Sequence, residues 1–551
     1  MGSLYSFAFG LKFSVIKKKN SMLHCICQQA TWFLLTFFFL KLSDGGKVLV
    51  IPMDGSHWLS IQPVMERLHH RGHQVIAVVP DANLLIKPSD HYIVKTFAVP
   101  YSTEYLKTEL QKLGYKVFVH QPFLTRITET LARIRNITMI YLNNCKQLLY
   151  NKDLITYLQD SKFNVVVMDP LSPCGQIVAE YLSIPSVFYS RGIPCGLDAE
   201  ATKCPNPLSY IPKFFTGSTD HMTFNQRVNN VLFGSFQSMV CNLVYSPFEG
   251  LIKEFLHRDM TVVELYSQAS IWLLRYDFVF EYPRPIMPNM ILIGGINCAK
   301  EKPLTQEFES ILEKSGEDGV VVFSMGSMLS EIQMKKAMEI AKGLGTIPQT
   351  VLWRYTGEAP INLANNTKLF NWLPQNDLLA HPKTRAFITH AGSNGIYEGI
   401  CHGVPMVLIP LFGDQADNAV RIESRGAGIK LDAVKMTSKD LSNALRTVIY
   451  DKRYKENIQR LSSLHLDRPV EPLDLAVHWV EFVMRHKGAP HLRPAAHDLN
   501  WIQYYSIDVI ALLLAATFLF LFISLKSCLF CCKKCFCKSA RLSKKSKSKS
   551  Q

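Results

Sequence analysis

Residues 384–415, TRAFITHAGSNGIYEGICHGVPMVLIPLFGDQ, contain the pattern that decides the fold. An apolar run at 386–389 is followed by a glycine-rich turn, a helical pattern at 396–401 and a second apolar run at 405–409. This order predicts a strand, a helix and a parallel strand. Free backbone N–H groups and the positive end of the helix dipole would face outward at the turn, where they suit an anion such as a phosphate.

The same alternation of apolar runs and helical patterns extends over most of the chain. It predicts further helices at 58–68, 176–182 and 334–344, and strands at 47–53, 73–80, 165–168, 186–189, 319–323 and 350–354. Near-continuous apolar strands between helices are typical of a parallel sheet that is covered on both faces. A proline-rich stretch at 282–288 and a polar stretch that ends at Pro303 are expected to link the two halves. We predict an α/β protein with two doubly wound, Rossmann-like domains, 44–295 and 296–500, facing a cleft.

Two apolar runs near the ends of the chain predict the cellular location and membrane topology of the protein. The run at 30–40 follows three lysines and is too short to span a bilayer, which predicts a secretory signal within 1–43; a buried strand is the alternative. The run at 507–525 predicts a transmembrane helix. Aromatic residues precede it and basic residues follow it, which predicts a single-pass type I protein with a lumenal body and a cytosolic tail at 526–551. Lysines three and five residues from the end resemble a dilysine retrieval signal, so we expect the endoplasmic reticulum membrane.

The formal charge of +15 belongs to these two ends. Residues 1–43 carry five basic residues and the tail carries nine, and neither segment contains an acid. The remainder of the chain is therefore almost neutral. A nucleic-acid-binding protein would carry its basic surface on the folded domains, so we expect no nucleic-acid partner.

Cysteines and glycosylation sequons agree with this topology. Five of the 14 cysteines lie in the predicted tail, where palmitoylation or free thiols are expected rather than a zinc site. Seven are scattered through the body and do not have the pattern of a small disulfide scaffold. Asn136 and Asn365 begin sequons that would be available for glycosylation in a lumen.

Two polar residues follow strands of the predicted N-terminal sheet. His57 comes shortly after the first strand, and Asp169 directly follows the strand at 165–168. Both are expected at the carboxyl edge of the sheet, where open α/β sheets bind ligands. A histidine can accept a proton near neutral pH, and a carboxylate can fix its tautomer. The pair is a candidate general base with its orienting partner; a loop histidine and a helix-capping aspartate are the structural alternative.

The C-terminal half contains more polar residues at the ends of its predicted elements. Trp372 offers a flat face for a base, and the turn at 389–394 suits a diphosphate. Side chains that can accept hydrogen bonds from the hydroxyl groups of a ligand follow at Gln375, Glu398, Asp414 and Gln415. Because no Gly-x-Gly-x-x-Gly turn follows the first strand, this set fits a nucleotide-sugar better than a dinucleotide.

The quoted stretch, extended to HPKTRAFITHAGSNGIYEGICHGVPMVLIPLFGDQADNA at 381–419, resembles the signature of family 1 glycosyltransferases. It is most similar to the vertebrate UDP-glucuronosyltransferases, as is Asp-Gly-Ser-His-Trp-Leu-Ser at 54–60, and the part after about residue 295 resembles their phenol- and bilirubin-conjugating branch. The resemblance implies a GT-B fold with an N-terminal acceptor domain and a C-terminal UDP-sugar domain. It also makes His57 the base and Asp169 its partner.

The same resemblance assigns the donor site residue by residue. Trp372 would stack on uracil, Gln375 and Glu398 would bind the uracil and ribose side, and Asp414 and Gln415 would bind sugar hydroxyls. The diphosphate would lie at the strand ends and at the start of the helix. The complete donor-binding set is Ser324, Gly326, Arg354, Trp372, Gln375, Thr389, His390, Gly392, Ser393, Asn394, Glu398, Asp414 and Gln415.

The resemblance implies inverting transfer of glucuronic acid from UDP-glucuronic acid to hydroxyl or carboxyl groups of phenols, steroids, bilirubin-like compounds and xenobiotics. UDP-glucuronic acid would be a co-substrate, no cofactor is expected, and homo- or hetero-oligomers are expected. An Asp-x-Asp metal motif is absent from the sequence, so we expect no metal requirement. One alternative is a transferase of another UDP-hexose to steroids or lipids. Those sugars lack the carboxylate at C6, so a cation near C6 would distinguish a glucuronic acid donor from them, and Arg275 is a candidate for that cation. A non-catalytic membrane partner with the same fold is the other.

Overall fold

The computed structural model describes residues 45–193, 196–298, 301–329 and 331–547. The expected signal segment and the last residues of the tail, with the predicted retrieval signal, lie outside the described residues. The chain divides into two compact units, a body that ends at Pro490 and a C-terminal segment that starts at His491.

A first, seven-stranded sheet forms the N-terminal half of the body. Its strand order is β3-β2-β1-β4-β5-β6-β7, and all neighbouring strands are parallel. The chain order reverses between β1 and β4, so the carboxyl ends of these two strands mark the switch point where such sheets bind ligands. The strands are β1 (Lys47–Ile51), β2 (Gln74–Pro80), β3 (Ile93–Phe97), β4 (Val165–Met168), β5 (Ser186–Ser190), β6 (Ile271–Leu274) and β7 (Met290–Leu292).

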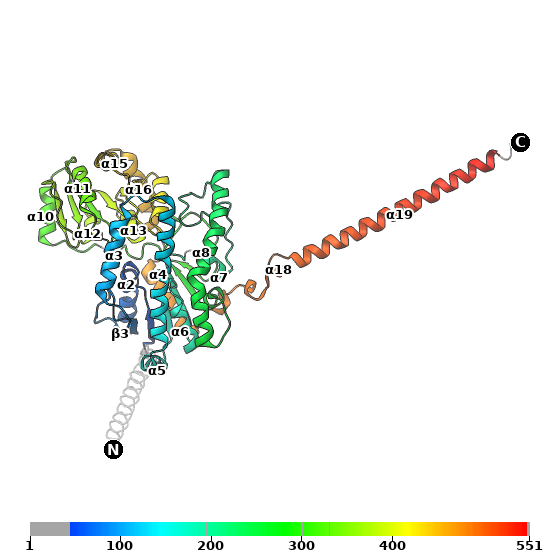
Figure 1. Ribbon diagram of the computed structural model, residues 1–551, viewed down its shortest axis with the longest axis horizontal. Helices are drawn as coiled ribbons and strands as arrows, with labels where there is room; N and C mark the ends of the chain where they lie inside the picture. The colour runs from blue at the N-terminus through cyan, green and yellow to red at the C-terminus, as the bar shows by residue number, and fades with distance from the viewer. Residues whose placement is uncertain (1–44, 194–195, 299–300, 330, 548–551) are drawn as a thin grey trace, which may run out of the picture. The chain divides into compact units, whose positions relative to one another are not determined.

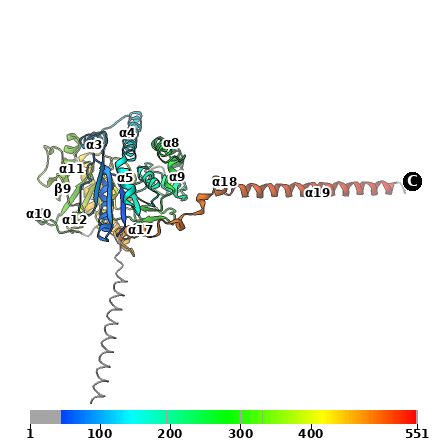
Figure 2. The same cartoon turned by 90° about the horizontal axis from the view of Figure 1, so that it is seen from below.

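Helices cover both faces of this sheet (Figures 1 and 2). Its central strands are mainly apolar, and all four residues of β4 are apolar and buried, because neither face of the sheet meets solvent. The two long helices α4 and α8 pack against each other (Figure 1). The helices are α2 (Ser56–His70), α3 (Thr103–Val117), α4 (Phe123–Leu149), α5 (Lys152–Ser161), α6 (Cys174–Leu182), α7 (Leu197–Thr202), α8 (Phe224–Leu256) and α9 (Val262–Tyr266).

The second sheet repeats the same topology with six parallel strands in the order β10-β9-β8-β11-β12-β13. Its switch point lies between β8 and β11. Side chains alternate along β8, so that Val321 and Phe323 pack into the core on one face of the sheet, and Val320 and Val322 pack on the other. The strands are β8 (Val320–Ser324), β9 (Thr350–Arg354), β10 (Thr367–Phe370), β11 (Thr384–Thr389), β12 (Met406–Leu408) and β13 (Gly428–Lys430).

The helices of the second half do not all stay with the second sheet. Helix α17 packs against α2 and against β4, β5 and β6 of the first sheet, so the end of the body returns to the N-terminal half. The predicted segment 296–500 therefore contributes to both halves. The helices are α10 (Gln306–Lys314), α11 (Met334–Leu344), α12 (Gln375–Ala380), α13 (Ser393–Cys401), α14 (Gln415–Ser424), α15 (Ser438–Tyr450), α16 (Lys452–Leu466) and α17 (Pro472–His486).

The segment that the sequence predicts to be a linker is more ordered than expected. Residues 282–288 contain no helix or strand, but β7 follows at once and pairs in parallel with β6. This three-residue strand escapes prediction because an edge strand so short has no detectable alternation.

A short 3₁₀ turn, η2 (Pro490–Leu492), lies at the boundary between the two units. The C-terminal unit contains a second 3₁₀ turn, η3 (Ala495–Asp498), and two helices, α18 (Trp501–Tyr504) and α19 (Ile507–Lys547). Its stretch Ile507–Cys537 is long and apolar enough to cross a membrane. The predicted tail cysteines lie on α19 and are exposed.

Candidate active site

The predicted base and its partner meet at the switch point of the first sheet. Asp169 follows β4, His57 lies in the first turn of α2 after β1, and β1 and β4 are neighbours. The Nδ1 atom of His57 lies 2.5 Å from Oδ2 of Asp169. The carboxylate is 5% exposed, whereas the imidazole is 32% exposed. The aspartate of the pair is thus buried, and the histidine is partly exposed to solvent.

The electrostatics of this dyad fix its protonation. Burial alone would raise the pKa of Asp169, but the charge and hydrogen bond of His57 and the backbone N–H of Leu171 together hold it below its ordinary value. An ionised carboxylate accepts a hydrogen bond from Nδ1–H, so the lone pair of neutral His57 resides on Nε2. A nitrogen with such a lone pair can accept a proton.

The N-terminus of α2 lies against the switch point of the second sheet. Gly55 has φ +73°, and a Cβ there would come within 2.9 Å of Sδ of Met328, in the loop after β8. The side-chain amide of Asn394, at the start of α13, donates to the carbonyl of Ser56 at 3.4 Å. The carboxyl ends of the two sheets therefore face each other with His57 at their junction.

Arg275 crosses this junction. It follows β6, is 5% exposed, and donates from Nη1 to Oγ of Ser60 at 2.5 Å and to Oδ1 of Asn394 at 3.2 Å. Its guanidinium lies over the ring of Tyr189, whose hydroxyl donates to the carbonyl of Ser60. Helix α2, which carries His57, and helix α13, which is expected to face the diphosphate, are thus joined through the buried guanidinium of Arg275. The sequence suggests Arg275 only as a cation; its connecting position requires the fold.

The turn between β11 and α13 offers backbone donors. The N-cap of α13 is Gly392, no side chain caps the helix, and Ser393 and Asn394 form its first turn. Gly326, with φ +86°, and Gly392 lie on the two sides of the His390 imidazole, where a Cβ at either position would come within 2.5 Å of a ring atom. Only glycine fits at Gly326 without strain. Unsatisfied N–H groups at this helix end suit a phosphate.

Three buried polar atoms around this turn have no hydrogen-bond partner: Nδ1 of His390, Oγ of Ser327 and Nε of Arg354. Such atoms are uncommon in a protein core, and here they could hydrogen-bond to a bound anion. Burial lowers the pKa of His390 to about 4, so the ring is neutral at physiological pH and can donate a single N–H to an anion. Burial also lowers the pKa of Arg354.

The residues expected on the uracil and ribose side form two contacting pairs. Trp372 is 57% exposed, and the Arg354 guanidinium lies 5.0 Å from its ring centroid, so one face of the indole is supported. Gln375 opens α12 and donates from Nε2 to Oε2 of Glu398 on α13. Burial raises the pKa of Glu398 to about 7, although the Gln375 hydrogen bond opposes the shift.

Some residues of the predicted donor set hold the site's backbone. Ser324 and Thr389 are buried, and their hydroxyls accept the N–H groups of Gly326 and Ala391, which shapes the two turns. The side-chain oxygen Oε1 of Gln415 accepts hydrogen bonds from the backbone N–H groups of Leu411 and Phe412. These contacts give the three side chains a structural task at the carboxyl edge of the second sheet.

Asp414 precedes α14, and its Oδ2 accepts from Nδ2 of Asn418 at 2.8 Å. Nε of Arg191 lies 3.8 Å from the same carboxylate oxygen. Arg191 follows β5 and also pairs with Glu281, so the first half of the body supplies a cation beside the expected sugar-binding residue. The sequence pattern does not single out Arg191, because an arginine after a strand has no motif of its own.

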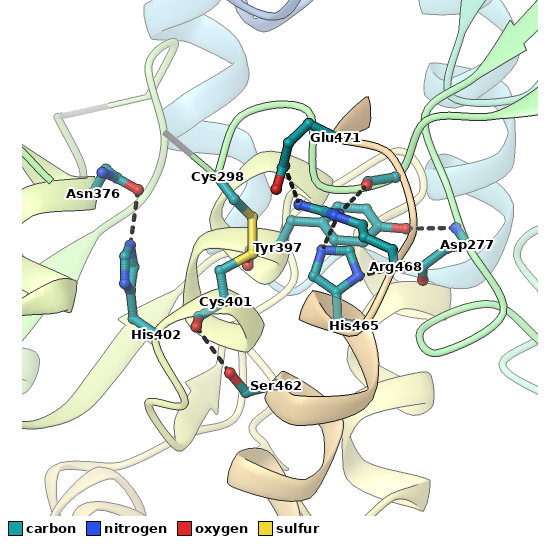
Figure 3. Close-up of a disulfide and its surroundings, with 11 residues drawn as sticks. Asp277, Cys298, Asn376, Tyr397, Cys401, His402, Ser462, His465, Arg468 and Glu471 are labelled. Carbon is teal, nitrogen blue, oxygen red and sulfur yellow. Dashed lines mark hydrogen bonds and ion pairs between the residues drawn. A yellow bond between two sulfur atoms is a disulfide. The ribbon is translucent and has the colours of Figure 1, made fainter. Parts of the chain in front are cut away.

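A disulfide ties the far end of α13 to the segment between the two sheets (Figure 3). Cys401 pairs with Cys298, and next to them Nδ1 of the buried His465 is hydrogen-bonded to Oδ2 of Asp277. The Tyr397 hydroxyl accepts the N–H of Asp277 at 2.9 Å. These contacts hold α13 at its C-terminal end, while its N-terminal end faces the site. Spacing along the sequence does not reveal which cysteines pair.

Other predicted features are placed without being brought to the site. A second disulfide, Cys145–Cys174, joins α4 to α6, and Cys204 is buried and free. Asn365 lies exposed in the turn before β10, whereas Asn136 lies exposed within α4. In the described part of the chain, one group of three side chains could hold a metal ion, namely Cys298, Cys401 and His465, and two of these are joined as the disulfide.

Comparisons with known proteins agree with this geometry. Residues 46–542 match the family model described as "UDP-glucoronosyl and UDP-glucosyl transferase". The chain is 58% identical over 516 residues to UDP-glucuronosyltransferase 1-2 of Rattus norvegicus, covering 94% of this chain and 97% of the relative. It is 57% identical over 507 residues to UDP-glucuronosyltransferase 1A1 of Homo sapiens, covering 92% and 95%.

Solved structures support the fold. CalG4, the calicheamicin glycosyltransferase, matches with a TM-score of 0.54 and 17% identity over 80% of this chain and 99% of that one. Os79 from O. sativa, solved in complex with UDP, matches with a TM-score of 0.55 and 17% identity over 80% and 100%. The two parallel sheets therefore form a GT-B fold, and the chain belongs to the UDP-glucuronosyltransferase family of enzymes.

Proposed function

We propose that this enzyme transfers glucuronic acid from UDP-glucuronic acid, with inversion, to the hydroxyl or carboxyl oxygen of small lipophilic acceptors. The observation that carries the proposal is the His57–Asp169 dyad, which faces the uncapped N-terminus of α13 across the junction between the sheets. A base for the acceptor and a binding site for the leaving group then lie on opposite sides of one reaction centre.

In this mechanism, His57 Nε2 takes the proton of the acceptor O–H while that oxygen attacks the anomeric carbon of the sugar. The bond from the anomeric carbon to the β-phosphate oxygen breaks, and UDP leaves with the electron pair from the opposite face, so an α-linked donor gives a β-linked product. Asp169 stabilises the imidazolium that forms. The N–H groups of α13 and the neutral His390 stabilise the charge that grows on the diphosphate.

The donor is inferred to be UDP-glucuronic acid because the relatives named above are UDP-glucuronosyltransferases. Arg275 supplies a buried cation with an unpartnered Nε between α2 and α13, which suits a donor that carries a carboxylate. We expect no metal requirement, since helix and side-chain donors already face the diphosphate. Acceptors would be phenols, steroids, bilirubin-like compounds and xenobiotics.

The location that fits this reaction is the endoplasmic reticulum membrane, with α19 as a single span, the body in the lumen and the basic tail in the cytosol. Assembly into homo- or hetero-oligomers belongs to the same proposal. The sequon asparagines Asn136 and Asn365 are exposed and would carry glycans in that compartment.

A donor competition assay tests the proposed function. Membranes that contain the full chain are offered equal amounts of labelled UDP-glucuronic acid, UDP-glucose, UDP-galactose and UDP-N-acetylglucosamine with one phenol. We expect the glucuronide to dominate in the wild type and the preference to shrink in Arg275→Gln more than in Arg275→Lys. A dominant glucoside would overturn the donor assignment, and the absence of any product with a panel of phenols, steroids and carboxylic acids would overturn the activity.

A further inference from the structure

Asn418, on helix α14, is a fully buried side chain that has no part in the proposed transfer reaction. It is 0% exposed and lies one helical turn after Asp414. Its Nδ2 donates to Oδ2 of Asp414 at 2.8 Å and to the carbonyl oxygen of Ala391 at 3.0 Å. Its Oδ1 accepts from Nη2 of Arg191 at 3.1 Å and from Nη1 of Arg421 at 3.4 Å. Both donors and both lone pairs of the amide are therefore used.

The groups around Asn418 fix the direction in which its amide points. Two guanidinium groups, which can only donate hydrogen bonds, lie on the oxygen side, and two oxygen atoms lie on the nitrogen side. A flipped amide would place N–H groups against guanidinium N–H groups and an oxygen against a carboxylate. The donor side of the amide therefore faces Asp414 and Ala391.

Ala391 depends on such support because its backbone is in the left-handed region. It has φ +66° and is 0% exposed, a conformation that residues with a side chain adopt rarely and mostly at functional sites. Oγ1 of Thr389 accepts its N–H at 3.3 Å, and Asn418 donates to its carbonyl. Ala391 directly precedes Gly392, the N-cap of α13. Its conformation therefore sets the direction in which the free N–H groups of α13 face the expected diphosphate.

The same amide nitrogen of Asn418 also holds the carboxylate of Asp414. That side chain is 33% exposed, and its Oδ2 meets Asn418 and, at 3.8 Å, Nε of Arg191. Among the described residues, none donates a hydrogen bond to its Oδ1, so this oxygen is available to a sugar hydroxyl. One side-chain amide thus fixes two groups that are expected to bind different parts of the donor.

We infer that Asn418 is a positioning residue that holds the sugar-binding carboxylate of Asp414 and the diphosphate-binding turn at Ala391 in a fixed relation to each other. The inference rests on the proposed function, because both groups are expected to bind the UDP-sugar. Asn418 is buried and acts only through these two groups. Arg191 follows β5, so the contact with Asn418 also connects them to the first half of the body.

A series of three ligands of increasing length tests the inference. The full chain in detergent is titrated calorimetrically with uridine, UDP and UDP-glucuronic acid, a measurement that needs no turnover. Asn418→Asp keeps the size and the acceptor side of the residue but removes both N–H donors. We expect the affinity to stay within two-fold for uridine, to fall about five-fold for UDP and to fall at least twenty-fold for UDP-glucuronic acid. Uridine reaches neither group, UDP reaches only the turn, and UDP-glucuronic acid reaches both.

Two further variants separate positioning from a loss of stability. Asn418→Ser, which adds no charge to the core, should give the same order of effects. The matched control is Asn230→Asp, at a second asparagine that is 0% exposed, whose amide donates to the carbonyls of Leu208 and Ile211 at 2.8 and 2.9 Å. Because Asn230 lies on α8 in the first half of the body, the control should lower the unfolding temperature and leave all three affinities within two-fold.

Two results would overturn the inference. An equal loss of affinity for all three ligands would show that Asn418 only stabilises the fold, and unchanged affinities in both Asn418 variants would show that neither group depends on it. A wild-type chain that binds UDP but not UDP-glucuronic acid would contradict the proposed donor instead. The comparison of uridine with UDP would then still test the role of Asn418 at the turn.

Discussion

Replacing Glu398 with glutamine is expected to stabilise the body at alkaline pH and to weaken donor binding at the same time. Glu398 lies on α13, and its carboxylate accepts a hydrogen bond from Gln375. Burial raises its pKa from the ordinary 4.5 to about 7. The ionised form is therefore held in a place that disfavours it, which is typical of a group kept for function.

The sign of the stability effect follows from linkage. The folded-state pKa lies above the unfolded value, so Glu398 favours folding below pH 4.5, and this contribution is lost as the pH rises to 7. The shift corresponds to about 3 kcal/mol at pH 8. Glutamine does not titrate, so Glu398→Gln should unfold a few degrees higher than the wild type at pH 8, and the difference should shrink toward zero near pH 4.5.

Donor binding should change in the opposite direction. A hydrogen bond to a charged acceptor is worth about 1.5–3 kcal/mol, so loss of the carboxylate should raise KM for UDP-glucuronic acid by roughly ten-fold or more. Thermal unfolding in detergent and initial rates in membranes measure the two effects. Glu456→Gln, at an exposed glutamate of α16, is the matched control. If the unfolding temperatures of Glu398→Gln and the wild type differ by the same amount at pH 5 and at pH 8, the burial argument is refuted. An unchanged KM for the donor would show that Glu398 does not belong to the donor site.

Three further predictions concern the donor site and the disulfide at the C-terminal end of α13. Trp372→Ala should raise KM for the donor about ten-fold with little change in kcat, since base stacking contributes about 1–3 kcal/mol. In the same rate assay, Trp372→Phe should have a KM close to that of the wild type, because its ring can still stack. The double variant Cys298→Ser/Cys401→Ser should lower the unfolding temperature, because the disulfide spans 103 residues and such a link contributes roughly 2–5 kcal/mol; a melting curve equal to that of Cys204→Ser would contradict this. Finally, EDTA should leave the turnover of washed membranes unchanged, and strict loss of turnover that Mg²⁺ restores would contradict a metal-free donor site.

The strands and the contact between His57 and Asp169 are predictable from the sequence because they depend on local patterns. The run that becomes β4 is apolar throughout and the run that becomes β1 is apolar after Lys47, and His57 and Asp169 follow them closely. Both residues then reach the same edge of the sheet in any doubly wound topology. Their 2.5 Å contact is a consequence of the two strands being neighbours.

The long helices and the interdomain contacts are not predictable in the same way. In α8, apolar residues occupy both the inward and the outward face, so the sequence has a weak 3.6-residue period, and only the fold shows which residues are exposed. Helix α17 is amphipathic, but its sequence does not show which sheet it covers. Arg275 connects Ser60 with Asn394, which lie 334 residues apart, and no motif indicates such a pair.

The central claim is that His57 acts as a base oriented by Asp169. The most direct test is turnover with UDP-glucuronic acid and a phenol in membranes, together with UDP binding, for His57→Ala, Asp169→Asn and the control His70→Ala on the same helix. We expect kcat to fall by about 10²–10⁴ in the first two variants, with UDP affinity within two-fold of the wild type and His70→Ala unaffected. Turnover of His57→Ala equal to that of the wild type would contradict the account.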